Sequence, residues 1–366
     1  MSEDRLARLR QAMGPLGLEA LALIPGPSLL YLTGLSFHLM ERPVVCLVTP
    51  DEAPRLILPE LEAGKIERAR LPLQAFPYAE DERSRTQAFA QAASILSRRK
   101  VGIEPLRMRV LELRLLEQAA PLATFLPGDQ AVGALRLAKD DHEVGAIRRA
   151  IAAAETALEA TLPLIRVGLS EKEVAAEVTV QLLRAGSDSE LPFPPIVASG
   201  PNSAVPHAVP GERRLQHGDL LILDWGATVD GYISDLTRTF AIGEPDPESV
   251  RIHEVVQQAN AAGRWAVRPG AACAEIDQAA RAVITAAGYG EFFPHRTGHG
   301  IGLEAHEPPY LRGDNPMPLS PGMTFTVEPG IYLPGRRGSR VEDNVLVTSD
   351  GCECLTQLPR ELRVIP

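Results

Sequence analysis

Two different patterns of hydrophobic and polar positions divide the chain. In the first 127 residues, short apolar runs alternate with segments whose apolar residues recur at helical spacing. The apolar runs lie at 21–24, 44–48, 55–58 and 101–103, and the helical segments lie at 86–97 and 107–118. Short apolar runs are typical of buried strands, and their alternation with helices predicts an α/β domain built on a central sheet. None of the runs is followed by a Gly-rich phosphate-binding sequence, so nucleotide binding is not expected.

The pattern changes at Lys139. Residues 140–164 are rich in alanine and periodic at helical spacing, and acidic residues mark the start of this helix. We therefore expect a domain boundary between 127 and 139, which gives an N-terminal domain at 1–130 and a second domain at 139–366.

The second domain contains the same order of elements twice. Two helical segments precede a group of apolar strands, and this order is then repeated. The helices lie at 141–165 and 170–185 with strands within 219–241, and again at 247–267 and 273–287 with strands within 323–348. This order predicts an internal duplication, and the junction of two similar halves forms a crevice suited to a small ligand.

Composition and charge narrow the class of protein. The chain has 366 residues, of which 45% are hydrophobic and 23% charged, as in globular proteins. Its 37 basic and 47 acidic residues give a net charge of −10, which has the wrong sign for binding nucleic acid. Four scattered cysteines do not form a disulfide framework, and the sequence shows neither a signal-peptide pattern nor a membrane-spanning apolar run. We expect a cytoplasmic protein.

Two aspartates interrupt apolar segments that are predicted to pair as a β-hairpin. Asp224 lies in the first segment and Asp235 in the second, and the dipeptide Asp230-Gly231 between them is typical of a hairpin turn. A buried carboxylate costs several kcal/mol to desolvate, so each aspartate must meet a cation, accept hydrogen bonds or be protonated. Ion pairs with Arg238 are the alternative to a functional role.

A cluster of histidines follows later in the chain. Three of the eight histidines, His295, His299 and His306, fall within twelve residues, and glycines flank His299 on both sides. Glycine lets backbone or ligand approach closely, although it also serves in tight turns. The cluster is not an H-E-x-x-H zinc motif.

Two glutamates complete the candidate set. Glu328 and Glu342 each interrupt an apolar segment, and taken singly they are explained as a surface glutamate before Pro329 and as an ion-pair partner of Arg340. Taken together with the two aspartates and one histidine, they form four carboxylates and an imidazole with a formal charge of −4. Two divalent cations would neutralise that charge, so the set favours a dinuclear metal centre.

These motifs resemble those of a known family. Asp224, Asp235, His299, Glu328 and Glu342, in the contexts D-W-G-A, S-D-L-T-R-T, T-G-H-G-I-G-L, V-E-P-G-I-Y and R-V-E-D-N, resemble the pita-bread metallopeptidases of family M24: aminopeptidase P, prolidase and methionine aminopeptidase. The resemblance covers residues 139–366. The preceding domain is similar to the N-terminal domain of creatinase and of the proline-specific members. The resemblance implies an α/β N-terminal domain and an α+β pita-bread catalytic domain with pseudo-twofold internal symmetry.

The resemblance also implies roles for the five residues. Asp224 would chelate one metal ion, Asp235 and Glu342 would bridge two, and His299 with Glu328 would complete the second ion's ligands. Ligands dominated by oxygen favour Mn²⁺, with Co²⁺ or Zn²⁺ as alternatives. Glu328 would in addition carry a proton from the attacking water to the leaving nitrogen.

Further residues match substrate-facing positions of the proline-specific enzymes. His207, His295 and His306 would face the substrate, and His207 or His306 would stabilise the oxyanion. Arg340 would line the substrate site, and Arg340 and Thr237 are candidates for hydrogen bonds to the metal ligands.

The implied activity is hydrolysis of the bond between an N-terminal residue and proline. Most methionine aminopeptidases lack the N-terminal domain, which points to the proline-specific members. We expect an Xaa-Pro aminopeptidase of the aminopeptidase P type, with the Xaa-Pro dipeptidase (prolidase) as the alternative and a creatinase-like hydrolase or non-catalytic binding protein as more remote ones. The expected partners are peptides with proline at position 2 and a second copy of the chain in a homodimer, without nucleic acid or membrane.

Overall fold

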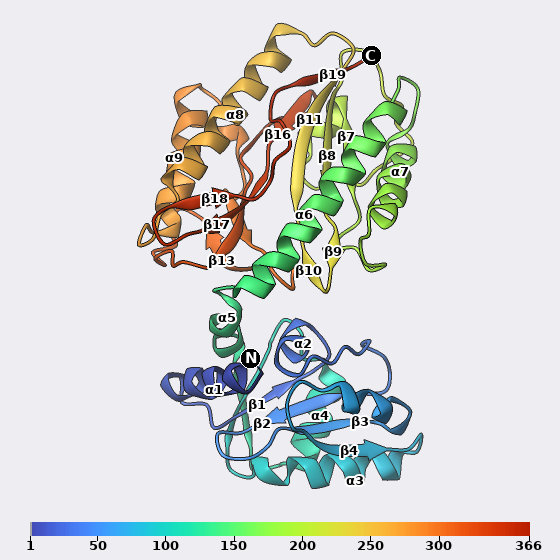
Figure 1. Ribbon diagram of the computed structural model, residues 1–366, viewed down its shortest axis with the longest axis vertical. Helices are drawn as coiled ribbons and strands as arrows, with labels where there is room; N and C mark the ends of the chain where they lie inside the picture. Colours follow the sequence, from blue (N-terminus) through green and yellow to red (C-terminus); the bar gives the residue numbers. More distant parts are fainter. Residues whose placement is uncertain (1) are drawn as a thin grey trace. The chain divides into compact units, whose positions relative to one another are not determined.

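The computed structural model describes residues 2–366, with side chains from Asp4 onward. Within it the chain separates into two compact units, Met1–Arg136 and Leu137–Pro366 (Figure 1).

The N-terminal unit is built on one mixed six-stranded sheet with the order β4-β3-β2-β1-β5-β6. Its strands are β1 (Ala20–Leu23), β2 (Val45–Val48), β3 (Arg55–Pro59), β4 (Gln74–Tyr78), β5 (Lys100–Ile103) and β6 (Thr124–Pro127). The central strands β1 and β2 are buried at every residue, as their continuous apolar runs predict. Strands β4 and β6 were not predicted; both are edge strands with partly exposed residues, and each contains a proline, which is tolerated at a sheet edge.

Helices flank this sheet. They are α1 (Ser2–Met13), α2 (Pro27–Thr33), α3 (Glu82–Ala92), α4 (Val110–Ala119) and α5 (Asp129–Arg136), with the short helices η1 (Gly14–Leu16), η2 (Glu60–Arg68) and η3 (Ala93–Leu96). Helix α3 begins earlier than the apolar spacing predicted, because the side chain of Asp81 accepts a hydrogen bond from the backbone N–H of Ser84 and so caps the helix. Phe89 on α3 and Leu116 on α4 pack into one buried cluster with the strands.

The second unit contains two layers of helices around two sheets. The helices are α6 (Asp141–Thr161), α7 (Glu171–Arg184), α8 (Pro247–Ala266) and α9 (Cys273–Ala286), with η4 (Leu162–Leu164), η5 (Gly200–Ala204) and η6 (Gly290–Phe292). Figure 1 shows α6 and α7 on one side of the strands and α8 and α9 on the other. The repeated order of two helices and then strands is therefore present in space.

The strands of this unit form one sheet for each half. The first has the order β19-β11-β8-β7, and the second has the order β13-β12-β14-β17-β18. Two further pairs, β9 with β10 and β15 with β16, extend from them. The strands are β7 (Ile196–Ser199), β8 (Leu220–Trp225), β9 (Thr228–Val229), β10 (Tyr232–Ile233), β11 (Leu236–Ile242), β12 (Gly298–Gly300), β13 (Glu307–Leu311), β14 (Thr324–Val327), β15 (Gly330–Leu333), β16 (Arg337–Arg340), β17 (Asp343–Val347), β18 (Cys352–Cys354) and β19 (Arg363–Ile365).

Helix α6 starts where the acidic residues predict. Asp140 accepts the backbone N–H of Glu143, and the Glu143 side chain accepts the N–H of Asp140, which together form a capping box. Residues at helical spacing on one face of α6, including Ala150 and Ala154, are fully buried. The indole N–H of Trp225 on β8 donates to the Ala154 carbonyl and joins the helix to the first sheet.

The predicted hairpin is present but broken in its middle. Strands β8 and β11 pair antiparallel, and β9 and β10 continue beyond them to a turn at Asp230 and Gly231, both of which have positive φ. Between the two ladders, the Ser234 hydroxyl accepts the backbone N–H of Ala227. Asp235 therefore lies just before β11 and not within a strand as expected.

The two glutamates also lie at breaks between strands and not inside them. Glu328 follows β14 directly, and Glu342 lies between β16 and β17 in an isolated bridge to Thr237. Proline at 329 ends the ladder after Glu328 because it lacks a backbone N–H. At such breaks, a side chain is not restricted to one face of the sheet.

Candidate metal centre

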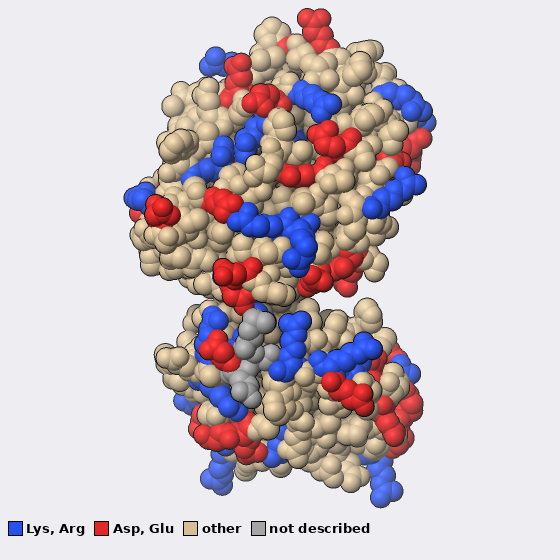
Figure 2. Space-filling model, in the orientation of Figure 1, with Lys and Arg blue, Asp and Glu red and all other residues tan. Residues whose placement is uncertain are grey.

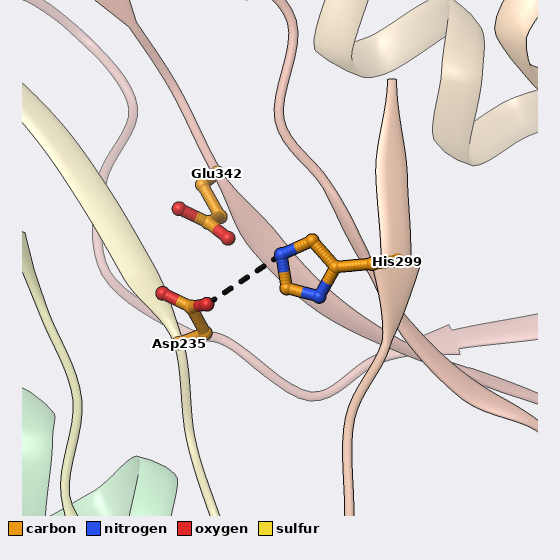
Figure 3. Close-up of side chains that lie close together, drawn as sticks. All are labelled: Asp235, His299 and Glu342. Atoms are coloured by element: carbon orange, nitrogen blue, oxygen red, sulfur yellow. Dashed lines mark ion pairs between the residues drawn. The ribbon is translucent and has the colours of Figure 1, made fainter. Parts of the chain in front are cut away.

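Asp235, His299 and Glu342 converge inside the second unit. Each side chain offers one ligand atom, and these atoms all lie within 4.8 Å of one another. The His299 Nε2 atom is 3.7 Å from Asp235 Oδ2, and Figure 3 shows both carboxylates turned toward the imidazole. The three residues are 2–5% exposed. Residues that are far apart in the sequence thus form one buried group with the spacing of a metal site.

The glycines beside His299 let its strand lie close to its neighbours. A Cβ at Gly298 would be 1.9 Å from the Thr326 carbonyl oxygen, and one at Gly300 would be 2.2 Å from the Pro308 carbonyl oxygen. The His299 Nδ1 atom lies 3.3 Å from the Gly300 carbonyl, which can only accept, so Nδ1 carries the proton. Nε2 is the ring nitrogen directed at the carboxylates, and it is the atom that a metal ion would bind in place of a proton.

Glu328 joins this group through His299. Its Oε1 atom lies 3.1 Å from His299 Nε2 and accepts the Thr326 hydroxyl at 3.1 Å. Burial alone would raise the pKa of Glu328, but the charge and the hydrogen bond of His299 lower it to about 2. Its side chain is 15% exposed and lines the cavity described below.

Asp224 lies on β8 beside the same group. Its Oδ2 atom accepts the Arg340 guanidinium at 2.6 Å, whereas its Oδ1 atom is buried without a hydrogen-bond partner among the described residues. Glu342 shows the same division, because Oε2 accepts the Thr237 hydroxyl at 2.6 Å and Oε1 has no such partner within residues 2–366. Burial and neighbouring carboxylates raise the pKa of Asp235 and Glu342 well above their usual range.

The unpaired oxygens fit a bound cation. Four buried or half-buried carboxylates surround one imidazole, and Arg340 makes its ion pair with Asp224 alone within the described part of the chain. Unsatisfied buried carboxylate oxygens are costly, and oxygen donors with a single imidazole suit divalent ions such as Mn²⁺, Co²⁺ or Zn²⁺. The residues present therefore fit divalent metal.

The alternative ion pairs with Arg238 do not form. Arg238 donates to the Asp343 carboxylate at 2.8 Å and to the backbone carbonyl of Glu342, so it is directed away from Asp224 and Asp235. The sequence alone could not show that Arg238 pairs with Asp343, because Arg238 lies only three residues after Asp235 and a pair with that nearby aspartate was equally plausible.

The two expected supporting hydrogen bonds are present. Thr237 donates to Glu342, and Arg340 donates to Asp224, as described above. Arg340 also donates to the Tyr332 hydroxyl at 2.8 Å and to the Pro206 carbonyl at 3.1 Å. Arg340 is 3% exposed and therefore acts mainly inside this network.

Sequence reasoning missed two residues of this network. Tyr332 links Arg340 to His295, whose Nε2 atom lies 2.9 Å from the tyrosine hydroxyl. Asn344 donates to the Asp235 carbonyl and accepts the Asp235 N–H at 3.2 Å, which fixes the break that holds this aspartate. The only signal for Asn344 was its place two residues after Glu342.

A cavity of about 700 Å³ opens beside the metal centre. All five predicted ligands, the three predicted substrate-facing histidines and Arg340 line it, and most of the remaining lining is apolar. The apolar lining includes Phe193, Pro194, Ile196, Val209 and Pro210. A mostly apolar cavity with a few convergent polar groups is typical of a small-molecule site.

The three histidines occupy different positions in this cavity. The His306 ring packs edge-on against His299 with centroids 4.1 Å apart, and burial followed by the charge of His299 lowers its pKa to about 4. His295 is half-buried, and burial lowers its pKa as well. His207 is exposed on the turn after η5. Because the pKa of His306 lies well below 7, His306 is neutral at pH 7.

Two family patterns match the chain. The pattern of metallopeptidase family M24 matches residues 145–349, and that of the Creatinase/Prolidase N-terminal domain matches residues 5–138. The first covers more than half of the chain. The chain belongs to metallopeptidase family M24.

Individual relatives agree with this result over the whole length. The probable dipeptidase PepE of Mycobacterium bovis is 36% identical over 99% of this chain and 96% of its own. The solved structure of a dipeptidase from Pyrococcus horikoshii OT3 has a TM-score of 0.92 at 38% identity, covering 98% of this chain and 99% of that one. The Xaa-Pro dipeptidase from Bacillus anthracis has a TM-score of 0.91 at 34% identity, covering 100% of both chains. The expected fold class, an α/β N-terminal domain followed by a pita-bread domain, is confirmed.

Proposed function

We propose that this chain is a metallo-exopeptidase that hydrolyses Xaa-Pro dipeptides at a dinuclear metal centre. The observation that carries the proposal is the buried group of Asp235, His299 and Glu342, with unpaired carboxylate oxygens, on the wall of a cavity lined by histidines. Asp224 and Glu328 complete the proposed ligand set, as the family resemblance implies. Divalent ions held there would polarise the scissile carbonyl and acidify water at neutral pH.

The protein's own groups handle the proton and the developing charge. Glu328 faces the cavity and takes the proton from the attacking water, then delivers it to the leaving proline nitrogen. His306 is neutral and lies next to His299, so one ring nitrogen donates a hydrogen bond to the developing oxyanion. His207 and His295 line the cavity and hold the substrate.

The cavity suits a prolyl residue. Proline has no N–H in the scissile amide, so a peptidase cannot hold it by pairing an extended strand through that group. The apolar wall formed by Phe193, Ile196 and Val209 offers a surface for the pyrrolidine ring instead. Recognition then depends on shape and on the metal centre and not on backbone pairing.

A dipeptide is favoured over a longer peptide. Several relatives are named as dipeptidases, which supports the alternative of the sequence analysis better than its preferred aminopeptidase P. Arg296 also lines the cavity, with its guanidinium 4.6 Å from the centre of the Tyr310 ring. A cation at this place fits the free carboxylate of a dipeptide, which a longer peptide lacks at that position.

The deciding experiment compares Ala-Pro, Ala-Pro amide and Ala-Pro-Ala after metal removal with EDTA and readdition of Mn²⁺. We expect kcat/KM for Ala-Pro to exceed that for the other two at least tenfold, and Arg296→Met to reduce this preference by raising KM for Ala-Pro. A higher kcat/KM for Ala-Pro-Ala would establish the aminopeptidase P type instead. No hydrolysis of any of the three would refute the proposed activity.

Two finer expectations remain predictions. Mn²⁺ as the native ion is to be decided by activity with Mn²⁺, Co²⁺ and Zn²⁺ in turn, and the homodimer by the mass of the protein in solution. Within residues 2–366, no helix is both long and apolar enough to span a membrane. On the face seen in Figure 2, basic and acidic side chains are interspersed.

A further inference from the structure

A buried carboxylate outside the metal centre holds both ends of the segment that carries His207. Glu171, the first residue of α7, is 0% exposed. Its Oε1 atom accepts the backbone N–H and the hydroxyl of Ser199, both at 2.8 Å, and the Asn202 amide at 3.1 Å. Its Oε2 atom accepts the same Asn202 amide at 3.0 Å and the backbone N–H of Gly211 at 3.1 Å. One side chain thus joins residues 199 and 211.

This carboxylate is not needed to cap its own helix. The capping box of α7 is formed by Ser170 and Glu173, whose side chains accept each other's backbone N–H groups. Within the described residues, the donors to Glu171 are neutral groups of the segment 199–211. Arg213, a cation near that segment, pairs with Asp219 and donates to the Ser199 hydroxyl. Burying a carboxylate costs several kcal/mol, and here hydrogen bonds to one loop offset that cost.

The segment between the two held ends forms part of the cavity wall. Residues 206–210 all line the cavity, and His207 is among them. Beyond Glu171, the segment is attached to the site by the Pro206 carbonyl, which accepts from Arg340, and by the Ser203 hydroxyl, which accepts the Gly338 N–H at 2.8 Å. Its outer part packs weakly, since Val209 is 86% exposed. The position of the outer part therefore depends on how its base is held.

We propose that Glu171 is a positioning residue that sets the place of His207 and the adjoining wall at the substrate cavity. A glutamine at 171 keeps the volume but has only one acceptor oxygen, and its NH₂ group faces the donors of Gly211 or of Ser199 and Asn202. The segment then loses a side-chain anchor at one end and keeps its backbone anchors, the Lys172 N–H to the Gly211 carbonyl and the pairing of Ser199 with β8. The consequence for catalysis rests on the proposed function, whereas the consequence for the segment itself does not.

The first test measures backbone hydrogen exchange in the metal-free protein. We expect Glu171→Gln to speed exchange of the Ser199 and Gly211 N–H groups at least tenfold, while the Thr239 N–H in the middle of β11 exchanges as in wild type. Glu173→Gln is the matched control, since it lies on the same helical turn and its contacts are the capping-box hydrogen bonds and an exposed ion pair with Arg214. Unchanged exchange at both positions in Glu171→Gln would overturn the proposal, even in a protein that cleaves no peptide.

The second test is a double-mutant cycle on Ala-Pro hydrolysis at saturating Mn²⁺. We expect Glu171→Gln to lower kcat/KM about tenfold and to have less than a twofold further effect in the His207→Ala background, because it acts through that histidine. If the decreases in kcat/KM of the two single variants multiply in the double variant, Glu171 acts only on general stability, and the proposal is overturned. If Glu171→Gln does not fold, Asn202→Ala removes the donor shared by both oxygens and enters the same cycle. Inactivity of wild type on Ala-Pro would reject the proposed function and leave the exchange result standing.

Discussion

Glu342 and Asp343 are neighbours in the sequence and are almost equally buried, at 2% and 0% exposed, yet their charges are balanced in opposite ways. Asp343 accepts Arg238 at 2.8 Å and Arg360 at 2.7 Å, and Arg264 lies 3.4 Å away. Glu342 accepts one hydroxyl, from Thr237, and keeps one unpaired oxygen within the described residues. Asp343, the first residue of β17, lies among cations, whereas Glu342, just before that strand, lies among other acids.

This contrast distinguishes a structural carboxylate from a functional one. Burial would raise the pKa of both, but the arginines lower that of Asp343, whereas burial and the charges of Glu328 and Asp224 raise that of Glu342 well above its usual range. The fold supplies a counter-charge for Asp343 and leaves Glu342 dependent on one from outside. A buried acid without a protein cation is therefore the better indicator of a metal site.

The largest expected effect comes from replacing Glu342, the acid that lacks a protein cation. Glu342→Gln removes a proposed bridging ligand, and losing several kcal/mol of transition-state stabilisation corresponds to a decrease in kcat/KM of about 10³-fold or more. Stability of the metal-free protein should stay within about 1 kcal/mol of wild type, because an unpaired buried charge has been removed. Kinetics on Ala-Pro and guanidinium unfolding in EDTA measure the two quantities. Retention of wild-type activity would exclude Glu342 from the centre.

The second largest expected effect is on stability and comes from replacing Asp343, the acid that is paired with arginines. Asp343→Asn leaves Arg238 and Arg360 buried or half-buried without their carboxylate, and breaking a buried ion pair costs about 3–5 kcal/mol. We expect a decrease of this size in the free energy of unfolding, measured with guanidinium in EDTA. The folded protein should still bind Mn²⁺ in calorimetric titration. A variant as stable as wild type that had lost Mn²⁺ binding would reverse the assignment of the two neighbours.

The sequence indicated Glu342 as a ligand and Thr237 as a hydrogen-bond donor to the ligands, but it did not single out Asp343 or its arginines. The helix start at Asp140, the turn at Asp230 and Gly231 and the five spaced motifs are local signals, and local signals are visible in a sequence. Ion pairs are not local. Arg340 stands two residues before Glu342 in the sequence, yet it pairs with Asp224, 116 residues earlier, because β16 meets the first sheet in the folded chain.

The same limit applies to residues that support the site from outside it. In the sequence, Glu171 cannot be distinguished from other acidic residues at the start of a helix. Only the folded chain brings Ser199 and Gly211 to its side chain. Edge strands such as β4 were missed for a related reason, since their partial exposure removes the apolar run that identifies a buried strand.

A smaller expected effect, on metal affinity, comes from replacing Thr237, whose hydroxyl donates to Glu342. Thr237→Val removes the hydroxyl that donates to Oε2, and losing a hydrogen bond to a metal ligand weakens metal affinity about 10–100-fold. Thr237→Ser keeps the hydroxyl and should bind Mn²⁺ within a few-fold of wild type. Calorimetric titration of both variants separates loss of the hydrogen bond from loss of the methyl group. Equal affinities in the two would show that the hydroxyl does not orient Glu342.

The smallest effect tests whether the arginines around Asp343 share its charge. Arg264 is the most distant of the three, its side chain is 21% exposed, and it also donates to the side-chain Oδ1 atom of Asn260 at 2.8 Å. Arg264→Met leaves Asp343 with two closer arginines, so we expect a loss of only about 1 kcal/mol in the free energy of unfolding. Arg268→Met, which breaks an exposed pair with Glu275, is the matched control and should cost less than about 0.5 kcal/mol. A loss from Arg264→Met as large as that from Asp343→Asn would mean that the cluster depends on all three arginines at once, and that its charge balance is as narrow as that of the metal centre beside it.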